Sequence, residues 1–176
     1  AIQCEKGPIS DTGGRTTVIT TGNAVYEDSD ISSSSCINSG TTFAMTAGTV
    51  LLKSSGSAGK GLNCDGEIYL YGGTLRVVTT GKQYVYGRLD SSAKGIKSKS
   101  SLTIESGTIW VRATGGEGSE GIESKNVMTI NGGDIAVYAY DDCLNASNNI
   151  TINGGSVYCY STGNDGVDSN GTFTLT

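Results

Sequence analysis

The sequence predicts an all-β fold, a right-handed parallel β-helix (β-solenoid) of about six rungs with three short strands in each. A turn of the form [K/E/D]-[G/C]-[I/L/V]-x-[S/A/C] occurs five times, and late in the chain its copies begin about 22 residues apart, a period typical of solenoids. Apolar residues alternate with period two around each turn, as in strands with one buried face. The chain also contains 27 glycines in 176 residues, which suits a fold with many tight turns.

The first strand of each repeat precedes a glycine pair, and its inward residues are Phe43/Met45, Ile68/Leu70, Leu102/Ile104, Met128/Ile130 and Ile150/Ile152. The corners are Gly72-Gly73, Gly132-Gly133 and Gly154-Gly155, with Ala47-Gly48 and Ser106-Gly107 as variants. Glycine adopts a positive φ there at little cost. The second strand has the inward pairs Val50/Leu52, Leu75/Val77, Ile109/Val111, Ile135/Val137 and Val157/Cys159. With the repeated turn as a third strand, we expect three faces around one apolar channel.

The two ends of the chain differ from the repeats. Residues 1–40 lack the repeat and predict an irregular N-terminal cap, so that residues 41–176 form the β-helix of a single domain. The chain stops at Thr176, after one strand of a new rung. An uncovered rung would offer unpaired backbone to another molecule. Head-to-tail self-assembly through the end rungs is therefore one expectation.

Composition restricts the possible functions. The chain has no histidine, which removes Ser-His-Asp and Cys-His catalysis and imidazole zinc sites. The net charge of −5 and the low share of charged residues disfavour a nucleic-acid partner. No apolar run approaches the length of a membrane span, so we expect no membrane insertion. Five cysteines favour a secreted, extracellular or cell-surface setting. Three Asn-x-Ser/Thr sequons would accept glycans on a eukaryotic secretory route, but Asn and Thr are so common in β-helix turns that chance explains them equally well.

Large aromatic side chains gather at outward positions of the second strands. The candidate sugar-binding platform consists of Trp110, Tyr138, Tyr158, Tyr160, Arg76 and Arg112. Aromatic rings stack on the C–H faces of sugars, while guanidinium groups bind hydroxyls or carboxylates. The alternative is that tyrosine occupies exposed strands simply because it packs well across them.

Acidic and amide side chains gather in the later turns. The candidate metal set consists of Asp141, Asp142, Asn164, Asp165, Asp168, Glu120 and Glu123. Closely stacked carboxylates repel unless a cation lies between them, and an all-oxygen set suits Ca²⁺. The alternative is that these residues occupy turns for conformational reasons and extend into solvent.

The string from Asp142 to Val157, and the parallel strings from Ser119 and Asn164, resemble the repeat D-D-G-I-x-S-x-x-x-L-x-I-x-G-G-x-I. That repeat is typical of a family of bacterial carbohydrate-binding domains, which are right-handed parallel β-helices distantly similar to pectate lyases. The resemblance implies binding of cellulose or acidic-sugar polymers, together with calcium. It maps the family's acidic pair onto Asp141-Asp142 and onto Asn164-Asp165. The earlier turns depart from the pattern, and there Lys94 and Lys97 are candidates to meet a uronate carboxylate directly.

Three functions are compatible with these features. The first is a secreted, non-catalytic polysaccharide-binding protein with calcium sites in its acidic turns. The second is a structural subunit of an extracellular filament or matrix that assembles head to tail. The third is a calcium-dependent polysaccharide lyase with a lysine such as Lys97 as base, which requires a lysine beside the metal. We expect the first and do not expect an enzyme.

Overall fold

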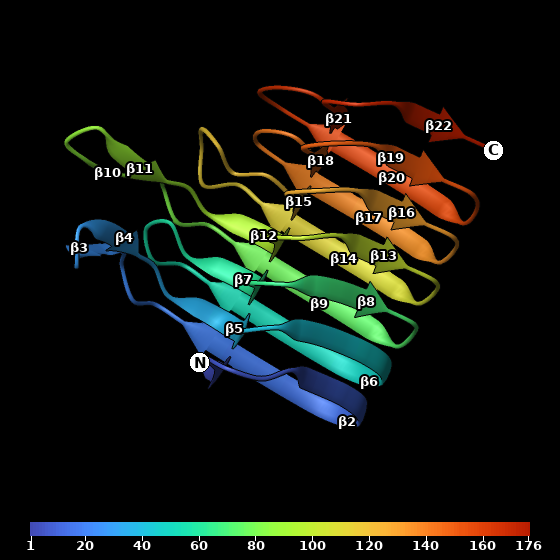
Figure 1. Ribbon diagram of the computed structural model, residues 1–176, viewed down its shortest axis with the longest axis horizontal. Helices are drawn as coiled ribbons and strands as arrows, with labels where there is room; N and C mark the ends of the chain where they lie inside the picture. The colour runs from blue at the N-terminus through green and yellow to red at the C-terminus, as the bar shows by residue number, and fades with distance from the viewer.

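The computed structural model describes all residues 1–176, and its regular elements are strands only (Figure 1). They form two parallel sheets and two antiparallel hairpins. The first sheet has seven strands, in the order β1 (Ile2–Cys4), β5 (Ser35–Ser39), β7 (Lys60–Cys64), β12 (Lys94–Ser98), β15 (Ile122–Ser124), β18 (Leu144–Ala146) and β21 (Val167–Ser169). Five of these strands carry the repeated turn motif, so the prediction that this motif forms a strand is confirmed.

The second sheet has eleven strands and doubles back at β6 (Thr42–Ser54). One limb continues from β6 through β9 (Thr74–Thr79), β14 (Thr108–Ala113), β17 (Asp134–Ala139) and β20 (Ser156–Ser161). The other limb continues through β8 (Glu67–Leu70), β13 (Leu102–Ile104), β16 (Met128–Ile130), β19 (Ile150–Ile152) and β22 (Phe173–Leu175). The last member, β2 (Ile9–Thr20), pairs with β6.

The prediction of a right-handed parallel β-helix with three faces in each rung is wrong, although the all-β class is correct. Two of the expected faces belong to one curled sheet, because β6 runs unbroken through Ala47-Gly48 and pairs with both β8 and β9. Gly48 has a φ of 84°, which bends the strand without ending its pairing. Two antiparallel hairpins add structure that the expected coil does not contain.

The N-terminal segment is regular, so the predicted irregular cap is also wrong. Strand β1 pairs with β5, and the long β2 follows β6 from Ile9 to Thr20 with register shifts around Thr12. Both sheets therefore begin within the first forty residues. The division into residues 1–40 and 41–176 stays a prediction, since strand pairing alone does not define domains.

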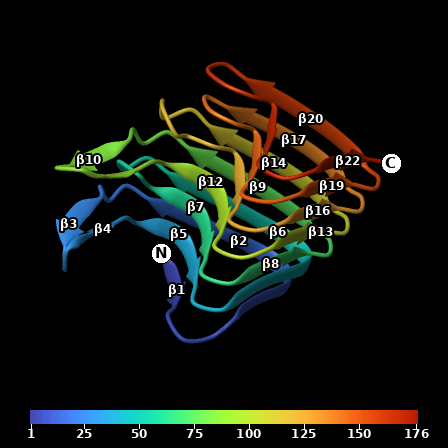
Figure 2. The ribbon, with the colours of Figure 1, turned by 45° about the horizontal axis from the view of Figure 1, so that its top comes forward.

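Two hairpins project from the same side of the molecule (Figure 2). One consists of β3 (Val25–Glu27) and β4 (Asp30–Ser32), and the other of β10 (Tyr84–Tyr86) and β11 (Leu89–Ser91). Both are antiparallel. Their tips are joined by stacking of Tyr26 on Tyr86, with ring centroids 4.0 Å apart.

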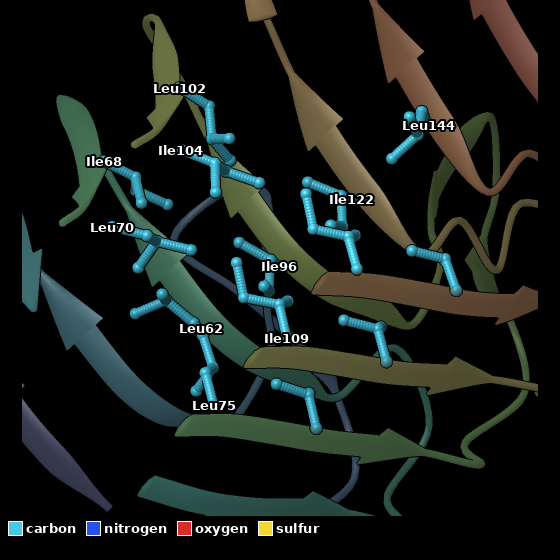
Figure 3. Close-up of a cluster of buried hydrophobic side chains, with 14 of the residues drawn as sticks. Leu62, Ile68, Leu70, Leu75, Ile96, Leu102, Ile104, Ile109, Ile122 and Leu144 are labelled. Atoms are coloured by element: carbon cyan, nitrogen blue, oxygen red, sulfur yellow. The ribbon is translucent and has the colours of Figure 1, made fainter. Parts of the chain in front are cut away.

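The apolar core lies between the two sheets (Figure 3). The predicted alternation is confirmed: Ile109 and Val111 on β14 are buried, whereas their neighbour Arg112 is exposed. Side chains of the same kind stack in register, and one such column is Leu62, Ile96, Ile122 and Leu144. Each fully buried aliphatic side chain contributes about 1.5–3 kcal/mol to the stability of the fold. Because the strands of this core are in parallel register, the outward side chains between them also form columns.

The glycine corners behave as the sequence predicts. Gly73, Gly133 and Gly155 all have positive φ, at 85°, 100° and 88°. A side chain at these positions would strain the backbone.

The structure contains no helix long and apolar enough to cross a lipid bilayer.

Candidate functional site

A surface aromatic cluster lies on the limb of the curled sheet formed by β9, β14, β17 and β20, with two exposed rings and two half-buried ones. Pairing in register places Trp110 beside Arg76, and it places Tyr138 between Arg112 and Tyr160. Tyr158 lies opposite Ala136, which is itself paired with Trp110. The strands therefore bring together all six residues of the predicted sugar platform. We refer to Trp110, Tyr138, Tyr158 and Tyr160 as the aromatic face.

Tyr138 is the centre of the aromatic face. Its ring centroid is 6.0 Å from that of Trp110, 5.5 Å from Tyr158 and 6.2 Å from Tyr160. The three interplanar angles are 46°, 49° and 52°, so the rings are tilted against one another. Aromatic pairs at these centroid distances contribute about 0.5–1.5 kcal/mol each beyond burial alone. The surface is ridged rather than flat, and its rings are held in place by contact with each other.

The two arginines differ in what they can offer a ligand. The Arg76 guanidinium lies over the Trp110 ring, with Cζ 4.4 Å from the ring centroid. This cation–π contact fixes Arg76 and covers part of the indole face. Arg112 is exposed beside Tyr138 and forms no ion pair in the structure. Arg112 is thus the more available donor for a sugar hydroxyl or carboxylate.

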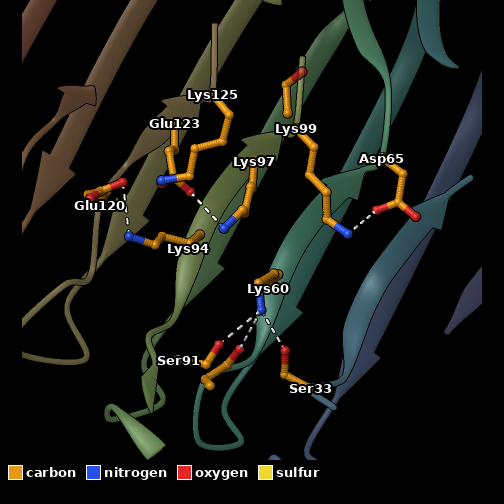
Figure 4. A network of polar contacts seen from close by, with 12 residues as sticks. Ser33, Lys60, Asp65, Ser91, Lys94, Lys97, Lys99, Glu120, Glu123 and Lys125 are labelled. Atoms are coloured by element: carbon orange, nitrogen blue, oxygen red, sulfur yellow. Dashed lines mark hydrogen bonds and ion pairs between the residues drawn. The ribbon is translucent and has the colours of Figure 1, made fainter. Parts of the chain in front are cut away.

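Two members of the predicted calcium set are held by lysines (Figure 4). Glu120 Oε2 is 2.9 Å from Lys94 Nζ, and Glu123 pairs with Lys97 at 3.2 Å and with Lys125. Burial raises the pKa of Glu120 to about 7, against the opposing effect of Lys94. Burial acts in the same direction on Glu123, but Lys94, Lys97 and Lys125 hold the pKa of Glu123 below its ordinary value. These two carboxylates need no metal ion to offset their charge.

The remaining members form an amide-bridged ladder between neighbouring repeats. Asn164 Nδ2 donates to Asp141 Oδ1 at 2.9 Å. Asn145 Nδ2 donates to Asp142 at 2.8 Å and to Asp168 at 3.3 Å. The backbone N–H of Asp165 donates to Asp142 Oδ1 at 3.1 Å. The structure therefore brings these residues close together, and amide hydrogens occupy several of the carboxylate oxygens.

Calcium binding in these turns stays a prediction. No group of three or more acidic, cysteine or histidine residues is placed to hold a metal ion. Burial, followed by the nearby charges of Asp141 and Asp168, does raise the pKa of Asp142, which a cation would counteract.

If Ca²⁺ binds there, we expect it to raise the melting temperature of the protein relative to a sample in chelator. A concentration of about 100 Kd would add about 2.7 kcal/mol to the free energy of unfolding. Differential scanning calorimetry measures the shift, and Asp142→Asn should reduce it. Identical melting temperatures in Ca²⁺ and in chelator would contradict calcium binding in these turns.

Lys97, the residue considered as a catalytic base, forms an ion pair with Glu123, which belongs to the predicted metal set.

Two features were missed at the sequence level. One is the stacked pair Tyr26 and Tyr86 on the two hairpins. The similarity of Val25-Tyr26 to Val85-Tyr86 could have suggested equivalent positions. The other is a polar cavity beside the first hairpin, whose lining includes the buried Lys60. No local sequence pattern marks Lys60 as buried.

The geometry thus defines an all-β protein with an aromatic and cationic cluster on an exposed sheet face. Residues 85–166 match a family model described as "Carbohydrate-binding domain-containing protein". The match supports a carbohydrate-binding role and a carbohydrate partner, and its description suggests a non-catalytic protein. Neither a search of the curated proteins nor a search of the solved structures finds a match.

Proposed function

We propose that this protein is a non-catalytic polysaccharide-binding protein and that the aromatic face, with Arg76 and Arg112, is its binding surface. The observation that carries the proposal is the contact of Tyr138 with the three other rings of the aromatic face. All four rings and Arg112 lie within the residues that match the carbohydrate-binding family model. We also propose that the protein is extracellular, as expected from the sequence, because such polymers are accessible there.

The aromatic face has the chemistry that a glycan chain requires. Tyr158 and Tyr160 are 51% and 53% exposed, so their rings are available for stacking on sugar C–H faces. The tilt between rings favours a single polymer chain, whose successive sugars present differently oriented faces, over a flat crystalline surface. Because the four rings are already packed together, little side-chain entropy is lost on binding.

Cellulose-like and acidic-sugar polymers are the two substrate classes to compare. Affinity electrophoresis in gels containing hydroxyethyl cellulose or polygalacturonate tests both in soluble form. We expect retardation of the native protein by at least one polymer. If Arg112 meets a carboxylate, retardation by polygalacturonate should weaken as salt increases, whereas stacking on the neutral polymer should tolerate salt. Unchanged mobility in both gels would contradict the proposal.

A further inference from the structure

An open cavity of about 650 Å³ lies between the β3–β4 hairpin and the outer face of the seven-stranded sheet. Its lining comes mainly from β1, β3, β4, β5, β7, β11 and β12 and is almost entirely polar. It includes the serine run 32–35 and three lysines, Lys60, Lys97 and Lys99. None of its lining residues belongs to β9, β14, β17 or β20. It is therefore separate from the aromatic face, and its volume is in the range of small-molecule sites.

Lys60 is the buried charge of this cavity (Figure 4). Its side chain is only 8% exposed. The ammonium donates to Ser33 Oγ at 2.5 Å, to the carbonyl of Ala58 at 3.4 Å and to Ser91 Oγ at 3.5 Å. All of these partners are neutral.

Lys60 differs in this respect from the other lysines on this surface. Lys94 pairs with Glu120, Lys97 with Glu123, and Lys99 with Asp65 at 2.7 Å. Lys60 forms no ion pair. Buried charges in proteins are normally paired, because an uncompensated buried ion is costly. A bound anion would supply the missing partner.

The electrostatics agree with an uncompensated ammonium. Burial, and then repulsion by Lys97 and Lys94, lowers the pKa of Lys60 to about 8. The charged and titratable groups around it are Lys94 and Lys97 on β12, Glu123 on β15, Lys99 and Asp65 at the strand ends, and Asp30 on β4. Because the pKa of Lys60 is lowered, the charged form of Lys60 destabilises the folded state below about pH 8. This destabilisation decreases as the pH rises and the ammonium loses its proton.

We infer that this cavity is a second binding site, for a small ligand that carries an oxyanion group, with Lys60 as the charged partner and the Ser33 and Ser91 hydroxyls as further donors. Carboxylate, sulfate and phosphate share this chemistry. The cavity is larger than one anion, so a small organic acid such as a sugar acid fits as well as an inorganic ion. This site does not depend on the proposed function of the aromatic face.

Isothermal titration calorimetry with three probes tests the inference on the intact protein: sodium sulfate, D-galacturonate and D-galactose. Galacturonate and galactose differ only in the carboxylate. We expect binding of sulfate, of galacturonate or of both at pH 7, and none of galactose. Sulfate alone would identify an inorganic ion as the source, and galacturonate alone a sugar acid. Binding of neither anion, or equal binding of galactose and galacturonate, would overturn the inference.

Substitution of Lys60 tests whether the anion binds in this cavity. Lys60→Met keeps the length of the side chain and removes an unpaired buried charge, so the variant should fold. We expect it to bind the anion at least tenfold more weakly, whereas Lys60→Arg retains binding. Lys82→Met, at an exposed lysine outside the cavity, is the matched control and should bind normally. Equal anion affinity in Lys60→Met would place the anion elsewhere.

A titration of the native protein gives an answer that does not depend on any variant. The Lys60 side-chain signal, followed by NMR in protein with ¹³C-labelled lysine, should show a higher pKa when the anion is bound, because the anion stabilises the ammonium. Affinity should accordingly fall as the pH rises through about 8. An unchanged Lys60 titration at saturating anion would contradict the site. Tyr138→Ala should leave anion binding intact, which separates this result from any failure of polysaccharide binding.

Discussion

Tyr138→Ala should reduce the affinity for the bound polysaccharide by about 10- to 100-fold, equivalent to about 1.4–2.8 kcal/mol. Tyr138 contacts Trp110, Tyr158 and Tyr160 at once, so its loss removes a stacking ring and also releases its three neighbours. Mobile rings lose more side-chain entropy when a ligand binds. Affinity electrophoresis over a range of polymer concentrations measures the change.

Two control variants make this result specific. Tyr138→Phe retains the ring and its tilted contacts with the three neighbouring rings, so it should bind nearly as well as the native protein. Tyr71→Ala removes an exposed tyrosine that follows β8, on the other limb of the curled sheet, and should not alter binding. If Tyr138→Ala binds as tightly as Tyr71→Ala, the aromatic face is not the binding surface.

Ile96→Ala should lower the free energy of unfolding by about 2–5 kcal/mol. Ile96 is fully buried on β12, in register with Leu62 on one side and Ile122 on the other (Figure 3). Truncation leaves a cavity in the middle of a stacked column, where neighbouring strands cannot collapse without breaking their pairing. Chemical denaturation should show the loss, and the melting temperature should fall by about 2–4 °C for each kcal/mol.

Two substitutions calibrate the core prediction. Ile96→Val removes one methylene group and should cost about 0.5–1.5 kcal/mol. Ile19→Ala alters an isoleucine that is 62% exposed on β2, and its effect should stay within about 0.5 kcal/mol. A similar loss of stability for Ile96→Ala and Ile19→Ala would contradict the placement of the core between the two sheets.

The strands and their buried faces could be predicted from the sequence because period-two alternation depends only on local residues. Residues such as Ile68, Leu102 and Ile104 are buried as that pattern requires. The joining of two predicted faces into one curled sheet could not be predicted in the same way. The alternation is the same whether a strand ends at Ala47-Gly48 or bends there, and only the pairing of β6 with both β8 and β9 distinguishes the two cases.

The candidate sites also combine features that the sequence could predict with features that depend on packing between distant segments. Outward positions of strands paired in register must form columns, so the proximity of Trp110, Tyr138, Tyr158 and Tyr160 followed from the sequence. Their mutual tilt did not, since it depends on side-chain packing. The burial of Lys60 arises because the β3–β4 hairpin and its flanking serines lie against β7, a contact between segments about thirty residues apart that no local pattern encodes.

The most direct test of polysaccharide binding by the aromatic face uses Trp110, the single tryptophan of the chain. Its fluorescence reports only on this face, because its ring contacts Arg76 and Tyr138. Titration with soluble oligosaccharides of the polymer that retards the protein should give a saturable change in tryptophan emission, with the affinity found by electrophoresis. Binding of the oligosaccharide with no change in Trp110 emission would show that the sugar binds elsewhere.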